Sequence, residues 1–239
     1  MVSAEEWVCG HVRPTGPAEV VRDRVWATTS RIPTADGIVW FKAAAASHRF
    51  EAELVAQLAG GWPDLLPRVL GYDSERGWLL LADAGTPFEQ LGNPPELWLR
   101  LLPRYAELQR EANVPSSVPD RTLSRWPELY DDLARSELPL GRAEIARLRR
   151  FAPQFSELCE ELAGYGLRDA IQHDYLHHKN AFVDGERLGS WTGEMHHVRT
   201  RSFHSLSPSG SLKSTTAYGR TIHGSRSCAR RTSNRGDTG

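Results

Sequence analysis

The apolar residues near the start of the chain follow the pattern of β-strands. Residues 19–42 are rich in β-branched and aromatic side chains, and the Thr-Ala-Asp-Gly segment at 34–37 is typical of a hairpin turn. Segments 66–72 and 78–82 have a similar character and are separated by polar residues. Between these strands, residues 47–59 carry apolar side chains at helical spacing and stop at two glycines. The pattern predicts three strands, one helix and two further strands.

The second part of the chain has the spacing of helices. Apolar residues three and four positions apart predict a helix from Glu96 onward, a shorter helix over 126–133 and a long amphipathic helix over 141–163. Pro103 predicts a kink in the first of these. Residues 83–87, Asp-Ala-Gly-Thr-Pro, predict a linker between the strand-rich and helical parts. Strands followed by helices indicate an α+β fold.

A polar loop followed by an apolar strand stands out at residues 172–185, Gln-His-Asp-Tyr-Leu-His-His-Lys-Asn-Ala-Phe-Val-Asp-Gly. Its apolar strand is predicted at 181–183, and loops held by buried strands commonly carry catalytic groups. His173, His177 and His178 have a spacing that zinc could use, but no cysteine or glutamate lies nearby. A zinc site is therefore disfavoured, and for the latter two histidines a solvated loop is the simpler interpretation.

The composition is that of an ordinary soluble protein with no nucleic-acid or membrane partner. The chain has 239 residues, 40% of them hydrophobic, and a formal net charge of −1, which argues against a nucleic-acid binder. The longest apolar run, 78–82, is far shorter than the roughly 20 residues that cross a membrane. Residues 1–6 lack the apolar core of a signal peptide. An odd number of distant cysteines favours a cytoplasmic location: Cys9, Cys159 and Cys228.

Two segments resemble a known family. The spacing from His173 to Asn180 is similar to the kinase catalytic loop, His-x-Asp-Leu-x-x-x-Asn. Together with the apolar strand and Asp-Gly turn that follow, it resembles the aminoglycoside phosphotransferase family, a branch of the protein-kinase-like fold. The run from Trp26 through residues 31–37 to Lys42 resembles the opening of the same family.

The resemblance implies a two-lobed protein-kinase-like fold. Residues 1–86 would form a nucleotide-binding lobe of β-sheet plus one helix, and residues 87–189 a partial helical lobe that carries the catalytic loop. The implied cofactors are ATP and Mg²⁺, and the implied partner is a small molecule with a hydroxyl acceptor. The implied reaction is transfer of the γ-phosphoryl group to that hydroxyl.

The nucleotide site is expected in the first lobe. By resemblance, Lys42 would orient the nucleotide phosphates and pair with a glutamate of the following helix. Glu51 is preferred for this role because its helical position leans toward the apolar face, and Glu53 is the second choice. No glycine-rich loop is present, so a turn at 27–30 is expected to offer backbone N–H groups. Asp83 lies in the linker whose backbone would read the base.

The catalytic loop departs from the family pattern at one position. Tyr175 stands where the resemblance places the aspartate that positions the acceptor hydroxyl. A phenol carries no charge at neutral pH, and the neighbouring Asp174 is expected to point in another direction. His173, Asp174, Tyr175 and Asn180 are the candidate catalytic residues, with Asn180 as the implied metal ligand.

The composition changes after Leu188. Residues 190–239 are rich in Ser, Thr, Gly and Arg and have no apolar period, which predicts a disordered basic tail and a truncated second lobe. The degenerate codons of residues 191–197, read from each third base, permit Asp-Trp-Gly-Asp-Ala, with the first Asp and the Ala forced. The family is expected to hold its metal with the first Asp of Asp-Trp-Gly-Asp. We infer a one-base frame slip near 188–190, in the gene or in its sequence record.

Three functions are compatible with this sequence. The leading one is a degenerate phosphotransferase with little or no activity, because the loop aspartate and the metal-binding aspartate are both missing. The second is an active small-molecule kinase whose unusual residues are errors in the sequence record. The third is a non-catalytic module that still binds a nucleotide through Lys42.

Overall fold

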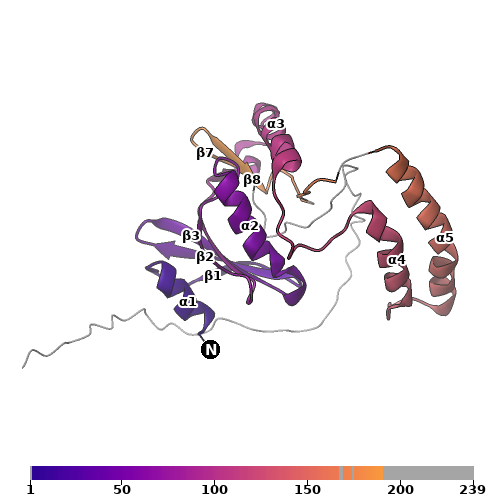
Figure 1. Cartoon of the computed structure of the whole chain (residues 1–239). Helices are drawn as coiled ribbons and strands as arrows, with labels where there is room; N and C mark the ends of the chain where they lie inside the picture. Colours follow the sequence, from indigo (N-terminus) through magenta and orange to yellow (C-terminus); the bar gives the residue numbers. More distant parts are fainter. Residues whose placement is uncertain (1, 167–168, 174, 191–239) are drawn as a thin grey trace, which may run out of the picture.

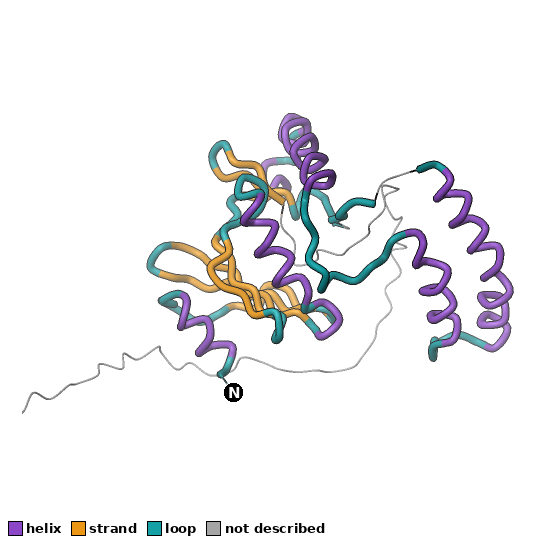
Figure 2. Tube along the Cα trace, in the orientation of Figure 1, coloured by secondary structure: helices purple, strands orange, loops and turns teal. Residues whose placement is uncertain are grey.

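A computed structural model describes residues 2–166, 169–173 and 175–190 (Figure 1). Two antiparallel sheets and five α-helices make up this part of the chain (Figure 2). The larger sheet contains β1 (Glu19–Arg24), β2 (Ala27–Thr34), β3 (Gly37–Ala44), β4 (Val69–Asp73) and β5 (Trp78–Ala82). The smaller contains β6 (Thr86–Pro87), β7 (Ala181–Asp184) and β8 (Arg187–Ser190).

The helices lie close to their predicted positions. They are α1 (Ala4–His11), α2 (Phe50–Gly61), α3 (Pro95–Glu111), α4 (Trp126–Arg135) and α5 (Arg142–Gly164), with 3₁₀ turns η1 (Ala46–His48), η2 (Phe88–Leu91) and η3 (Leu123–Arg125). The helix expected from residue 47 divides into η1 and α2. The sequence had not predicted α1, which begins with a capping box between Ser3 and Glu6.

The larger sheet has the strand order β1-β2-β3-β5-β4, which makes β3 its central strand. Side chains alternate between the two faces, so Lys42 shares a face with its register partners Thr29 and Leu79. The helix α2 covers this face. On the opposite face α1 packs Trp7 against Phe41, with ring centroids 6.0 Å apart.

One apolar cluster joins the two sheets. Leu54 and Leu58 of α2 pack with Leu81 of the larger sheet, and the same cluster reaches Leu101 of α3 and Ala181 of β7. Each of these side chains is at most 2% exposed. Burial of this size strongly favours a fixed arrangement, because each large apolar side chain removed from water contributes about 1.5–3 kcal/mol.

The predicted linker at 83–87 contains a strand. Its last two residues form β6, which pairs with β7 so that Thr86 lies opposite Val183. Gly85 precedes β6 with a φ of +94°, and a Cβ atom built on it would lie 2.3 Å from the carbonyl oxygen of Val183. Only glycine allows this backbone angle and this approach. The linker is therefore tied to the strand that follows the candidate catalytic loop.

The helices α4 and α5 form an antiparallel hairpin. Tyr130 stacks on Phe155 with ring centroids 4.6 Å apart and donates a hydrogen bond from Oη to the carbonyl of Leu148 at 3.0 Å. The predicted inward face of α5 is half-buried. Cys159, which the pattern had not singled out, is the buried residue of α5.

The predicted tail begins one residue too early. Ser190 ends β8, is 7% exposed, and donates a backbone hydrogen bond to Leu65 at 3.0 Å. This pairing continues the ladder in which Ala181 faces Ser190. The rest of the predicted tail, including residues 191–197 for which we infer a frame slip, lies outside the described residues. Within the described ranges, no helix has the length and apolar content that a membrane crossing needs.

Candidate functional site

A buried ion pair lies between the larger sheet and α2. Lys42 near the end of β3 donates from Nζ to the carboxylate of Glu51 in the first turn of α2, and each residue is 2% exposed. The predicted pairing of these two residues is confirmed. Glu53 does not take this position, because its carboxylate accepts a hydrogen bond from Ser117 Oγ at 2.6 Å. Buried charges are costly unless they are paired, so this pair fixes α2 against β3.

Basic groups gather beside this pair. Burial lowers the pKa of His48 from its ordinary value of 6.5, and the nearby charges of Lys42 and Arg121 lower it further. The ring of His48 stacks on Phe50 with centroids 6.1 Å apart. The lowered pKa favours the neutral form of the His48 imidazole, and the first turn of α2 also holds the acidic Glu51 and Glu53.

We expect His48 to make the folded protein sensitive to mild acid. Its pKa is lowered by folding, so the unfolded chain binds a proton first, and stability present above about pH 6.5 is lost as the pH falls through the lowered pKa. Between about pH 7.5 and about pH 5.5, the melting temperature of the wild type should fall more than that of His48→Gln. Parallel curves in differential scanning calorimetry would contradict this expectation.

The turn expected at 27–30 is part of strand β2. Its backbone is held in the ladder with β1 and β3, where Ala27 lies opposite Ala44. The hairpin tip lies earlier, at Val25 and Trp26, and the carbonyl of Trp26 accepts a hydrogen bond from Ala45 N at 2.7 Å. The prediction of a turn at 27–30 with free backbone N–H groups is wrong, because strand pairing already uses that backbone.

The candidate catalytic loop is attached to α3 at its start. His173 is 2% exposed, and its backbone N–H donates to Tyr105 Oη at 2.7 Å. One turn further along α3, Gln109 Nε2 donates to the carbonyl of Ile171 at 3.0 Å. The sequence predicted a helix from Glu96 onward but singled out neither Tyr105 nor Gln109. Their spacing of four residues was the available signal, since it puts both on one face of α3.

Asn180 closes the other end of the loop. It is 3% exposed, its Nδ2 donates to the carbonyl of Tyr175 at 2.9 Å, and its backbone N–H donates to the carbonyl of His177 at 2.8 Å. The ring of Tyr175 is 41% exposed and lies 5.9 Å from that of His177. Asp174 lies outside the described residues. The loop thus holds Asn180 rigidly and leaves the Tyr175 phenol at the surface.

His178 and Lys179 of the loop lie next to η2, which directly follows β6 of the smaller sheet. Glu89 of η2 lies 3.7 Å from His178 Nε2 and 3.2 Å from Lys179 Nζ. Among the residues that the structure describes, no group of three or more His, Cys, Asp or Glu side chains is arranged to hold a metal.

Asp83 lies at the end of β5 and faces Trp40. Its Oδ1 accepts a hydrogen bond from Trp40 Nε1 at 3.1 Å, which links the linker to the face of β3 that carries Lys42. The carboxylate is exposed. Its position near the nucleotide remains a prediction, as do the roles of Lys42 and Glu51 toward the phosphates.

Solved structures share this arrangement of sheets and helices. A choline kinase, LicA, from Streptococcus pneumoniae superposes with a TM-score of 0.59 and 13% identity, over 82% of this chain and 69% of that one. A choline/ethanolamine kinase family protein from Mesorhizobium loti gives a TM-score of 0.50 and 19% identity, over 81% of this chain. The chain has a protein-kinase-like fold.

The predicted fold class is therefore confirmed, while the likeness in sequence is weak. The chain spans 62% of the length of the Mesorhizobium loti protein. An aminoglycoside phosphotransferase from Streptomyces rimosus matches with a TM-score of 0.41 and 21% identity, over 72% of each chain. No protein-family model matches the sequence, and no curated protein does.

Proposed function

We propose that this chain is a degenerate small-molecule phosphotransferase that binds a nucleotide and transfers its phosphoryl group slowly or not at all. The observation that carries the proposal is the buried ion pair of Lys42 and Glu51. When a buried ion pair is replaced by apolar side chains, the free energy of unfolding often stays the same or increases. The stability of the fold is therefore weak grounds for the presence of such a pair. An ammonium group oriented by a carboxylate is suited to hold phosphate oxygens.

The nucleotide would lie between the Lys42 face of β3 and the linker. Lys42 would contact the phosphates, because an ammonium group donates charge-assisted hydrogen bonds to phosphate oxygens. The linker at 83–87 would supply backbone groups to the base. When bound, the nucleotide supplies a transferable phosphoryl group.

The weak step is activation of the acceptor. Phosphoryl transfer depends almost entirely on positioning and electrostatics, and a carboxylate normally orients the attacking hydroxyl. Tyr175 offers at its position an exposed, neutral phenol, whose backbone carbonyl is engaged by Asn180. The acceptor hydroxyl would therefore lack a charged group at that position to align it.

The described residues do not fit a protein-held Mg²⁺ by themselves. Asn180 Oδ1 is a ligand type that Mg²⁺ accepts, and the bond from Nδ2 to Tyr175 leaves that oxygen uninvolved. The second ligand implied by the family resemblance falls at 191–197, outside the described residues. We assign no reaction step to a metal ion, and we expect nucleotide binding to depend mainly on Lys42.

An active small-molecule kinase is the second candidate. Its acceptor would be a molecule of the choline or ethanolamine class, because the neighbours of similar fold are named as choline or ethanolamine kinases. This candidate requires that Tyr175 and the tail be errors in the sequence record. Sequencing the gene across codons 170–205 separates it from the leading proposal, because an aspartate codon at position 175 would restore the acceptor-binding carboxylate.

Nucleotide binding without turnover is the expected result for the unmodified chain. Isothermal titration calorimetry with ATP should give a micromolar to millimolar dissociation constant, changed by less than about threefold, or about 0.7 kcal/mol, when EDTA replaces Mg²⁺. Release of ADP in the presence of choline, ethanolamine or an aminoglycoside should stay at background.

Tyr175→Asp should leave that background unchanged, because the metal-binding aspartate is still missing. Measurable phosphorylation of any acceptor by the unmodified chain would refute the proposal.

A further inference from the structure

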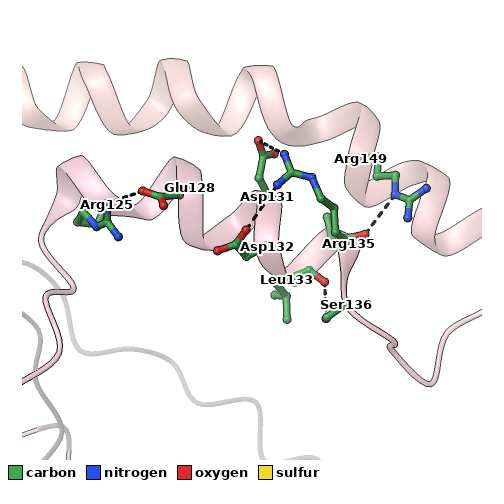
Figure 3. A network of polar contacts seen from close by, with 9 residues as sticks. Arg125, Glu128, Asp131, Asp132, Leu133, Arg135, Ser136 and Arg149 are labelled. Carbon is green, nitrogen blue, oxygen red and sulfur yellow. Dashed lines mark hydrogen bonds and ion pairs between the residues drawn. The ribbon is translucent and has the colours of Figure 1, made fainter.

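The hairpin of α4 and α5 presents a helix face to solvent. The two helices pack on each other and on η3, and Figure 1 shows them at one side of the molecule. Arg149 Nε of α5 donates to the carbonyl of Ala134 of α4 at 3.1 Å and so joins the two helices. Arg135 contacts Asp131 at 3.3 Å within α4, as Figure 3 shows.

Large side chains form a stripe along that outer face. Phe151, Leu158 and Tyr165 recur every seven residues and are 39%, 47% and 70% exposed. Residues seven apart lie on one face of a helix. Phe151 lies at the edge of this face, because its ring also contacts Tyr130 of α4 with centroids 6.2 Å apart, and Tyr165 directly follows the last residue of α5. We call the exposed row of Arg147, Phe151, Leu158 and Tyr165 the α5 stripe.

The charges beside the α5 stripe are divided by sign. Arg147 and Arg150 lie in its N-terminal half, and Glu157 and Glu161 in its C-terminal half. All four are exposed, and within the described part of the chain none of them makes an ion pair. Gln154 lies at the midpoint, seven residues from Arg147 and seven from Glu161.

This division makes the stripe complementary to itself in one orientation. If two copies of α5 cross antiparallel at Gln154, Arg147 lies opposite Glu161 of the partner subunit, and the reverse contact follows from the twofold axis. Phe151 then lies next to Leu158 of the partner subunit. A parallel arrangement would instead set arginine against arginine and glutamate against glutamate.

We propose that two copies of this chain associate through antiparallel α5 stripes. The helix has 23 residues and is therefore about 34 Å long, enough to align both charge pairs and both apolar pairs. An interface built on one helix is small, so the dissociation constant is expected in the micromolar range, about 1–100 μM. The association is independent of nucleotide binding and does not rest on the proposed function.

Charge reversal on the full chain tests this dimer. Sedimentation equilibrium over a range of loading concentrations should give a monomer–dimer equilibrium for the wild type. Arg147→Glu alone and Glu161→Arg alone should each weaken association by about tenfold or more, or about 1.4 kcal/mol, because each places like charges opposite each other twice. The double variant Arg147→Glu/Glu161→Arg should return to within a few-fold of the wild type.

A matched control lies on the same helix. Glu160→Arg makes the same change of charge but lies on the other side of α5 from Phe151, so it should leave association unchanged. Far-UV circular dichroism of each variant verifies that the helices are intact. A wild type that stays monomeric at about 100 μM, single variants that associate as well as the wild type, or a double variant that fails to recover would each overturn the proposal.

Discussion

Replacing Lys42 by methionine is expected to lower the free energy of unfolding by about 3–5 kcal/mol and to abolish nucleotide binding. The substitution removes the cation that faces the Glu51 carboxylate, and both groups are 2% exposed. A buried carboxylate that loses its cation keeps the cost of desolvation without the compensating attraction. Urea denaturation monitored by tryptophan fluorescence measures the loss of stability, and calorimetric titration with ATP measures the loss of binding.

A double variant separates the two consequences. Lys42→Met combined with Glu51→Leu removes both charges and leaves side chains of similar size, so stability should return to within about 1 kcal/mol of the wild type or exceed it. Nucleotide binding should stay absent, because the ammonium group is gone. A double variant that recovers binding would show that Lys42 does not hold the phosphates.

An exposed ion pair provides the control for this experiment. Arg104 contacts Asp64 at 2.6 Å, and the two side chains are 45% and 49% exposed. Asp64→Asn should cost less than about 1 kcal/mol, since water screens such a pair. Equal losses for the exposed and the buried pair would mean that burial does not govern the cost at Lys42.

Replacing Gly85 by alanine is expected to be the second severe change, with a loss of about 2–4 kcal/mol in the free energy of unfolding. The new methyl group would begin 2.3 Å from the backbone oxygen of Val183, at a φ of +94° that alanine tolerates poorly. Relief requires β6 to move away from β7, so the linker would shift relative to the catalytic loop. Chemical denaturation gives the stability of the variant.

Gly92 is the matched control for the effect of backbone angle alone. It has a φ of +77°, and a Cβ atom built on it meets nothing within 4 Å. Gly92→Ala should therefore cost only about 1–2 kcal/mol. If both alanine variants lost the same stability, the contact between Gly85 and Val183 would have no energetic role.

Much of the local structure could be predicted from neighbouring residues. Strands β2 and β3 follow from β-branched and aromatic composition, β5 follows from a short apolar run, and the hairpin between Thr34 and Gly37 follows from its turn residues. The pairing of Lys42 with a glutamate of α2 was implied by the family resemblance, and the helix period then favoured Glu51 over Glu53 because it leans toward the apolar face. A buried carboxylate facing a buried ammonium is then the low-energy arrangement.

Contacts between distant segments were not predictable in the same way. Tyr105 and His173 are 68 residues apart in the chain, and nothing near either one specifies that the phenol accepts the loop's N–H group. The pairing of β6 with β7 likewise depends on where α3, α4 and α5 carry the chain. The expected turn at 27–30 was wrong for a related reason, since the register with β1 and β3 decides where that hairpin ends.

The sequence by itself determined the order of strands and helices and the inward face of α2. These features depend on side-chain chemistry and on periods of two to four residues, which are written directly in the chain. The tertiary structure alone decided which α3 side chains hold the catalytic loop, how the linker joins β7, and that the α5 stripe faces solvent. These depend on the path of the whole chain, because an exposed or buried state is set by what packs nearby and not by the residue itself.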